Sequence, residues 1–219
     1  MVKPRSYTGT DIEISFEMSR CIHARNCFLS LPQVFDPARR PWVDPDGAPA
    51  DEIAAMIRTC PSGALTYRRM DGAADERPRA INRVQLRENG PVEITGDLRL
   101  NGEAYTRLTL CRCGASENKP FCDAAHDKAG FVATGEPDPS DKDSGEDRPG
   151  EVLQIRPVPN GPLGLVGPVE VTAGSGARLA RAEKVFLCRC GASKNKPFCD
   201  GSHKGAGFSA PAPETGPEG

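Results

Sequence analysis

The sequence predicts an α+β protein made of small domains that are folded around metal. Its nine Cys and three His fall into three groups of four along 219 residues. Two of the groups lie in near-copies of one stretch, CRCGASENKPFCDAAH at 111–126 and CRCGASKNKPFCDGSH at 188–203. Only 37% of the residues are hydrophobic, a poor supply for one large core. Units of roughly 60 residues usually need a metal or another staple, which agrees with the cysteine groups.

The first domain is expected at residues 10–75. Apolar residues alternate in DIEISFEM (11–18), which is the period of a half-buried strand. The stretch ADEIAAMIRTC (50–60) repeats its apolar residues at the spacing of one helix face, with Asp51 as N-cap and Pro61 after its end. A second strand follows in ALTYRR (64–69). This pattern predicts a small α+β unit in which Cys60 lies at the end of the helix.

Two repeats, 76–134 and 151–209, are expected to be mostly β. Each has short β-like runs before the copied motif, and the second holds a six-residue insertion between two of them. The motif itself is rich in Gly, Asn and Pro and is predicted to be a loop with one helical turn near its His. The acidic segment 135–150 is predicted to be a flexible linker, and 210–219 a disordered tail.

The copied motif has the spacing Cys-x-Cys-x8-Cys-x3-His, which places four metal ligands within sixteen residues. The chain has an odd number of Cys and its first residues lack the apolar run of a secretory signal, so the thiols are expected to hold metal in a reducing compartment, the cytoplasm. Spacing alone leaves two alternatives open. One is a structural zinc ion bound by three Cys and one His, and the other is an iron–sulfur cluster.

The motif resembles that of the CDGSH iron–sulfur domain family, the mitoNEET type. The second copy matches at every position, while the first has Ala124 and Ala125 where Gly and Ser are usual. The resemblance implies one [2Fe–2S] cluster per repeat, bound by three Cys and one His. The implied ligands are Cys111, Cys113, Cys122 and His126 in the first repeat, and Cys188, Cys190, Cys199 and His203 in the second. Because family members resemble intertwined dimers, two repeats imply a monomer with internal pseudo-twofold symmetry and a shared β-cap.

Further motif residues are candidates for contact with the cluster. Arg112 and Arg189 are expected to offset its negative charge, and Ser116 and Ser193 to donate hydrogen bonds to its sulfur. The alternative for each is a solvated Arg or an ordinary turn Ser. Asp123 and Asp200 are expected to cap the helical turn that carries the His.

The first domain resembles the divergent single-cluster ferredoxins. Cys21 and Cys27 keep the outer spacing of the ferredoxin motif, Cys60 precedes Pro61 as the remote ligand, and Ala24 replaces the middle cysteine. Three thiolates imply a [3Fe–4S] cluster, whereas a [4Fe–4S] cluster needs a further ligand such as His23 or water. The alternative is that the three Cys are buried without any cluster.

These features predict an electron-transfer protein with two [2Fe–2S] clusters and a third [3Fe–4S] or [4Fe–4S] cluster. A neutral imidazole in place of a thiolate makes a cluster less negative and easier to reduce, and it adds a site for a proton. The alternatives are storage and transfer of clusters to apo-proteins and, less favoured, a zinc-stabilised interaction module. No enzyme motif is found. Redox or apo-protein partners are expected, with no nucleic acid and no membrane, because the net charge is −2 and no long apolar stretch occurs.

Overall fold

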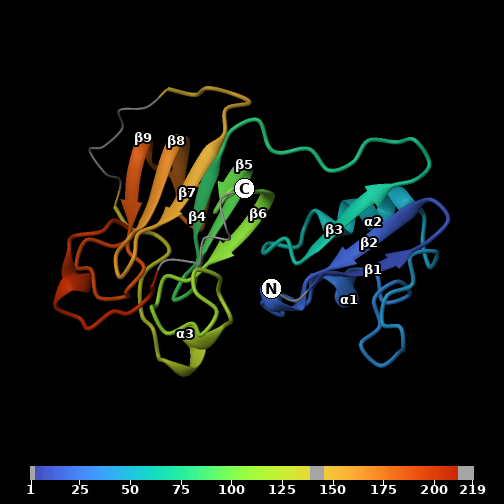
Figure 1. Ribbon diagram of the computed structural model, residues 1–219, viewed down its shortest axis with the longest axis horizontal. Helices are drawn as coiled ribbons and strands as arrows, with labels where there is room; N and C mark the ends of the chain where they lie inside the picture. The colour runs from blue at the N-terminus through green and yellow to red at the C-terminus, as the bar shows by residue number, and fades with distance from the viewer. Residues whose placement is uncertain (1–2, 139–145, 212–219) are drawn as a thin grey trace, which may run out of the picture. The chain divides into compact units, whose positions relative to one another are not determined.

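The computed structural model describes residues 3–138 and 146–211. The chain divides between Arg77 and Pro78 into two compact units, each with its own hydrophobic core (Figure 1). The copied motifs both lie in the second unit.

The first unit contains a three-stranded antiparallel sheet in the order β1-β2-β3. Its strands are β1 (Arg5–Thr8), β2 (Ile12–Phe16) and β3 (Leu65–Arg69), and its helical segments are η1 (Met18–Arg20), α1 (Asn26–Ser30) and α2 (Ala50–Ile57). Every second residue of β2 is buried, as the alternation predicts. Strand β1 begins before residue 10 and was not predicted, because only Tyr7 of its four residues is buried.

Helix α2 differs from its prediction at both ends. Its N-cap is Pro49, whose φ of −56° suits a helix start, and Asp51 lies in the first turn without a capping hydrogen bond to the helix. Asp51 instead forms an ion pair with Arg69 at 2.6 Å. The helix ends at Ile57 because Thr59 satisfies the Met56 carbonyl with both its N–H and its hydroxyl. Cys60 therefore lies in the turn beyond the helix.

The second unit is built on six strands, three from each repeat. They are β4 (Arg83–Leu86), β5 (Val92–Leu100) and β6 (Glu103–Leu110), followed by β7 (Leu153–Pro157), β8 (Leu163–Thr172) and β9 (Arg178–Leu187). Within each repeat the strands pair antiparallel. Two further pairings are parallel and join the repeats: β4 lies beside β8, and β7 lies beside β5.

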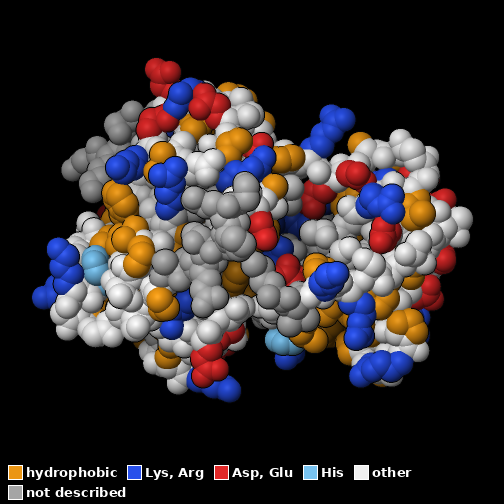
Figure 2. Space-filling model, in the orientation of Figure 1, with side chains coloured by type: hydrophobic (Ala, Val, Ile, Leu, Met, Phe, Trp, Pro, Cys, Tyr) orange, Lys and Arg blue, Asp and Glu red, His pale blue; other side chains and the backbone are white. Residues whose placement is uncertain are grey.

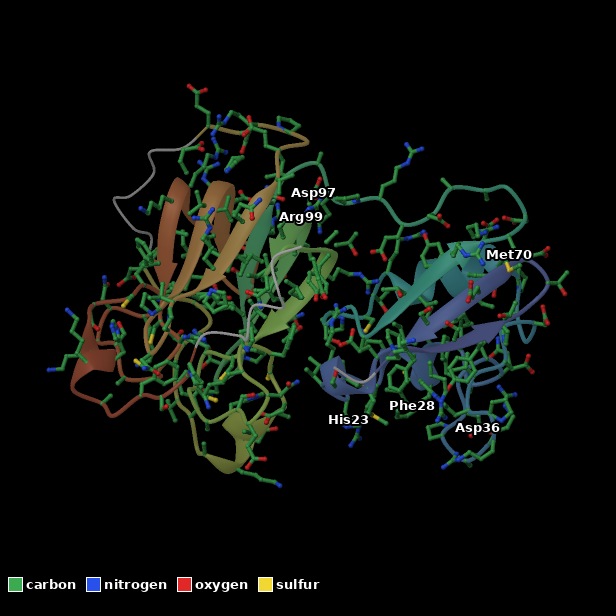
Figure 3. The ribbon with its side chains drawn as sticks, in the orientation of Figure 1. His23, Phe28, Asp36, Met70, Asp97 and Arg99 are labelled. Carbon is green, nitrogen blue, oxygen red and sulfur yellow. The ribbon has the colours of Figure 1, made fainter. Side chains whose placement is uncertain are left out.

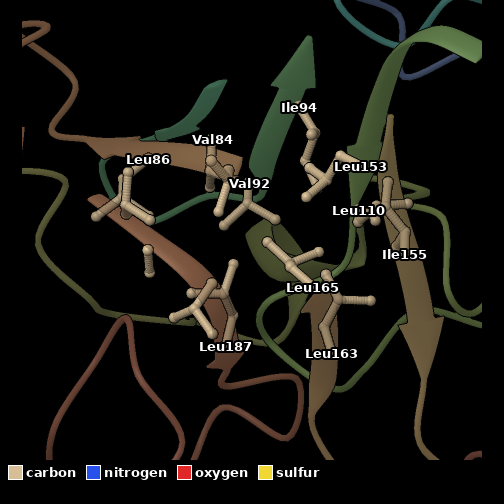
Figure 4. Close-up of a cluster of buried hydrophobic side chains, with 14 of the residues drawn as sticks. Val84, Leu86, Val92, Ile94, Leu110, Leu153, Ile155, Leu163, Leu165 and Leu187 are labelled. Atoms are coloured by element: carbon tan, nitrogen blue, oxygen red, sulfur yellow. The ribbon is translucent and has the colours of Figure 1, made fainter. Parts of the chain in front are cut away.

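Buried aliphatic side chains from all six strands form one core (Figure 4). In β5 buried and partly buried residues alternate along all nine positions, so one face of this strand supplies the core and the other does not. The six extra residues of the second repeat lie in the longer β8–β9 hairpin: part of them lengthen the turn between the strands, as predicted, and the rest lengthen the two strands.

The predicted linker is ordered at both of its ends. Glu136 accepts hydrogen bonds from the Ser175 N–H and hydroxyl, and Arg148 forms ion pairs with Glu151 and Glu183. The charged side chains of both ends thus find partners on the second repeat, while the flexibility of the segment stays a prediction. The middle of the segment, 139–145, lies outside the described residues.

The predicted tail is likewise ordered at its start. Ala210 is buried and exchanges two hydrogen bonds with Asn160, at 2.8 and 2.9 Å. Residues 212–219 lie outside the described part of the chain.

Within the described ranges, no helix combines the length and the apolar character that crossing a membrane requires.

Candidate metal centres

Each copied motif begins where the last strand of its repeat ends. Cys111 directly follows β6 and Cys188 directly follows β9. The loop then turns back on the strand, because Leu110 bridges to Phe121 and Leu187 bridges to Phe198. This return brings the third Cys beside the first two. The His that completes each set lies on a single helical turn, α3 (Ala125–Lys128) or η2 (Ser202–Lys204), as predicted.

In both motifs the four candidate ligands form two close pairs. The Sγ atoms of Cys111 and Cys113 are 3.6 Å apart, and Cys122 Sγ is 3.6 Å from His126 Nδ1. The second repeat has the same arrangement. There Cys188 and Cys190 Sγ are 3.8 Å apart, and Cys199 Sγ is 3.5 Å from His203 Nδ1.

These separations are those of two ligands on one tetrahedral metal. A metal–sulfur bond of about 2.3 Å and a metal–nitrogen bond of about 2.0–2.1 Å place two sulfurs about 3.8 Å apart and a sulfur and a nitrogen about 3.6 Å apart. A single zinc ion needs all four ligands around one point. Within residues 3–138 and 146–211, no three His, Cys, Asp or Glu side chains are arranged in that way. Each donor pair therefore has the separation of two ligands on one metal ion.

The thiols of the first motif differ in their acidity. The hydrogen bond between Cys111 and Cys113 lowers the pKa of Cys111 and raises that of Cys113, whereas burial raises the pKa of Cys122 to about 11. In the second motif burial raises the pKa of Cys190. Metal binding needs thiolates, so a metal that enters these sites must displace protons from Cys122 and Cys190.

The three Cys of the first unit line one cavity of about 600 Å³. Burial raises the pKa of Cys21 and Cys27, and the charge of Cys60 acts in the same direction on both. The three sulfurs are therefore close enough to influence one another. Backbone N–H groups of His23 and Phe28 point to the sulfurs of Cys21 and Cys27 and partly offset the effect of burial. Such N–H groups suit an anionic cluster.

Every charged residue that lines this cavity is basic, and all four are exposed: Lys3, Arg5, Arg25 and Arg40. Figure 2 shows hydrophobic side chains beside Lys and Arg side chains on the lower face of this unit. His23 also lines the cavity but is exposed, and Figure 3 shows it with Phe28 at the same lower edge. The cavity thus fits a negatively charged cluster bound by three thiolates.

Family models match both units. Residues 7–70 match a family described as "Divergent 4Fe-4S mono-cluster", and residues 89–127 and 160–204 match one described as "Iron-binding zinc finger CDGSH type". The chain belongs to the CDGSH-type iron-binding family and carries a divergent 4Fe-4S mono-cluster domain. This confirms the resemblances read from the motifs, and with them the presence of iron–sulfur-binding domains.

Relatives among the curated proteins are shorter than this CDGSH protein. It is 41% identical over 64 residues to "Uncharacterized protein YjdI" of Escherichia coli strain K12, and equally to that of Escherichia coli O157:H7. The matched stretch is 29% of this chain and 84% of each relative. No solved structure matches the chain.

The motif aspartates of the CDGSH repeats close the ligand loop. Asp123 accepts hydrogen bonds from the N–H groups of Glu117 and Ala125, at 2.8 and 3.0 Å, and Asp200 accepts from the corresponding Lys194 and Ser202. Each carboxylate thus contacts the start of the helical turn, as expected, and also ties it to the middle of the loop. Hydrogen bonds from Ser202 and from the Lys194 N–H keep the pKa of Asp200 below its usual range.

The motif arginines also hold the loops around each motif. Arg112 is buried, and its guanidinium donates to the backbone carbonyls of Gly90, Arg87, Ala133 and Thr134. Arg189 is also buried and donates to the carbonyls of Gly161 and Val158. That the two guanidinium groups offset the charge of a cluster stays a prediction.

The motif serines are also occupied elsewhere. The Ser116 hydroxyl donates to the Phe121 carbonyl at 2.7 Å, and the Ser193 hydroxyl donates to the Phe198 carbonyl at the same distance. Each hydroxyl has a single proton, so it has none left for a cluster sulfur. Lys119 and Lys196 were not predicted to take part, yet their ammonium groups donate to the carbonyls of Ser116 and Ser193. The occurrence of Lys at this position in both copies of the motif was the sequence feature that could have indicated this role.

Proposed function

We propose that the protein carries electrons by means of two [2Fe–2S] clusters, each bound by three Cys and one His, and a third cluster in the first unit. The supporting observation is the division of each ligand set into a Cys–Cys pair and a Cys–His pair, both at the spacing of one tetrahedral metal. A bound cluster supplies one-electron chemistry at a potential that its ligands set. In each motif the protein holds the two donor atoms of a pair close together.

The His ligands give the two proposed centres a route for protons. Nδ1 of His126 faces the Cys122 sulfur, which leaves Nε2 free to face away, 3.5 Å from the Asp127 carboxylate. The side chain of His126 is 16% exposed. A proton from solvent therefore has access to the ring nitrogen that does not bind metal.

The strand pairing supports a pseudo-twofold dimer within one chain. The first strand of each repeat lies between the middle strands of both repeats, since β4 pairs with β5 and β8, and β7 pairs with β8 and β5. We propose that this bridging forms the shared β-cap and that the protein is a monomer. For the first unit we keep the ferredoxin-like fold as a proposal.

The third cluster is proposed to bind Cys21, Cys27 and Cys60. The number of thiols favours [3Fe–4S], while the description of the matching family favours [4Fe–4S]. Electron paramagnetic resonance (EPR) of the protein as isolated distinguishes them, because an oxidised three-iron cluster is paramagnetic and an oxidised four-iron cluster of the ferredoxin type is silent.

A second candidate function is the transfer of clusters to apo-proteins. The observation that favours it is the partly exposed position of a single His in each ligand set, since protonation of the metal-binding nitrogen releases that ligand. For either function we propose protein partners in the cytoplasm and no enzymatic activity of the chain itself. The nine cysteines without disulfides agree with a reducing compartment.

The deciding experiment is an assay of iron, zinc and acid-labile sulfide in the purified protein, together with its visible spectrum. Iron and acid-labile sulfide in equal amounts, or with a slight excess of sulfide if the third cluster is [3Fe–4S], together with absorption in the visible, support the proposal. A colourless protein with one zinc per motif would refute it. Incubation with an apo-ferredoxin then separates the two functions, because a carrier keeps its clusters and a donor loses them.

A further inference from the structure

The ligand loops of the two repeats touch each other through two glycines. Gly114 follows Cys113, and Gly191 follows Cys190. A Cβ atom on Gly114 would lie 2.7 Å from the Cys190 carbonyl oxygen, and one on Gly191 would lie 2.5 Å from the Cys113 carbonyl oxygen. Both distances are shorter than any Cβ tolerates, so the backbones meet at these points only because no side chain intervenes.

The backbone conformation gives a second reason for glycine at both places. Gly114 has φ of +83° and Gly191 has φ of +79°, in the left-handed region that favours glycine. The contact is reciprocal, since each glycine packs against the cysteine that precedes the other glycine. It thus connects the two candidate metal centres directly.

Charges across the contact are reciprocal as well. Burial lowers the pKa of Arg112, and the thiolate of Cys188 in the other repeat opposes this shift. Burial likewise lowers the pKa of Arg189, and Cys111 opposes it. Each buried guanidinium therefore lies within electrostatic range of a ligand from the other centre.

We propose that Gly114 and Gly191 are positioning residues that hold the two centres close enough for an electron to pass between them. This rests on the proposed [2Fe–2S] centres. The covalent path from one metal-bound sulfur runs through Cys113 to its carbonyl, crosses one van der Waals contact to Gly191, and continues through Cys190 to the other centre. One centre is oxidised by one electron as the other is reduced, and no bond is made or broken.

The charges of the two loops set the direction of this exchange. Residues 111–128 contain three basic and three acidic residues, whereas 188–205 contain four basic and one acidic. Positive charge favours the reduced form of a centre. The single electron of a half-reduced pair therefore resides in the second repeat.

The test uses the full chain with both centres loaded, reduced stepwise with dithionite and followed by EPR. The half-reduced protein should give one simple signal, and the fully reduced protein a signal split or broadened by the second spin. Gly114→Ala and Gly191→Ala should lose this interaction while they keep their iron. Gly102→Ala is the matched control, because Gly102 has φ of +84° and a Cβ added there would meet no atom within 4 Å. It should retain the interaction.

A second measurement covers the case in which the glycine variants do not fold. In His203→Cys the two centres absorb differently, and a short pulse of dithionite should be followed by redistribution of electrons at a rate independent of protein concentration. A rate proportional to concentration, or wild-type protein without magnetic interaction when fully reduced, would overturn the inference. So would glycine variants that keep the interaction. Absence of iron and sulfide would instead refute the proposed function.

Discussion

At the scale of single residues, the two motifs differ at one position of strained backbone. Ala124 has φ of +66°, and its counterpart Gly201 has φ of +88°, so the turn before each His is left-handed. This conformation favours glycine, and the structure has it in both copies. An L-residue there costs about 1–2 kcal/mol relative to its usual conformation.

Ala124→Gly should therefore raise the free energy of unfolding of the second unit by about 1 kcal/mol, since relief of strain outweighs the greater freedom of the unfolded chain. Gly201→Ala is the matched opposite change and should lower it by a similar amount, because the space around Gly201 is open and only the backbone responds. Chemical denaturation of both variants measures the effect. Equal stability of the two variants and the wild type would contradict it.

The His ligand gives a second prediction at this scale. His203→Cys replaces a neutral imidazole by a thiolate, so the reduction potential of that centre should fall, and its visible absorbance should persist at a pH of about 5–6 where the wild type loses it. Spectra recorded during acidification check the second result, and a redox titration the first. Asp200→Asn serves as control. Hydrogen bonds keep the pKa of the Asp200 carboxyl below its usual range, so this group stays charged at a pH of about 5–6. Its contribution to stability is lost only at lower pH, and it therefore does not cause the loss of absorbance at a pH of about 5–6.

At the scale of elements, the start of β4, which bridges the two repeats, depends on one buried amide. Asn82, just before β4, donates to the carbonyls of Glu151 and Pro168 in the second repeat and accepts from the Asp97 N–H in the first. It is 2% exposed. The hydrogen bond to Pro168 is buried and the other two are partly buried, so these backbone groups depend on this side chain for a partner.

Asn82→Ala should destabilise the second unit by about 3 kcal/mol, because it leaves buried backbone groups without partners. The measurement is thermal unfolding followed by the loss of visible absorbance from the motif clusters. Asn26→Ala is the control, since it removes one exposed hydrogen bond to Thr59 in the first unit. An unfolding temperature lowered equally in both variants would show that Asn82 does not stabilise the junction of the two repeats.

At the scale of the whole molecule, β4 and β7 each pair with strands of both repeats, which makes the repeats one folding unit. A fragment of residues 78–219 should fold alone and remain monomeric. A fragment of residues 78–150 lacks β8, the partner of β4, and exposes an unpaired edge in β5, so it should associate or aggregate. Light scattering of both fragments tests this, and the full chain should give 23.4 kDa. A full chain of twice that mass would contradict the intramolecular dimer.

The sequence by itself determined the family, the ligand types and most strands. These follow from local features, since the spacing of Cys and His and the period-2 alternation of β2 depend only on neighbouring residues. The sequence also predicted Asp51 as the N-cap of α2, and Arg112 and Ser116 as residues near the cluster. Helix propensity and proximity in the chain do not show which other groups compete for the hydrogen bonds of these side chains. The structure supplied those partners: Arg69 for Asp51, and backbone carbonyls for Arg112 and Ser116.

Only the tertiary structure decided which strands cross between the repeats and where the two ligand loops meet. The pairing of β4 with β8 and the contact of Gly191 with Cys113 join residues far apart in the chain. Such contacts depend on packing of the whole core. The sequences of two near-identical motifs do not show whether their loops meet, or at which residues. The division of each ligand set into two pairs was decided in the same way, since it follows from how the loop returns onto its strand.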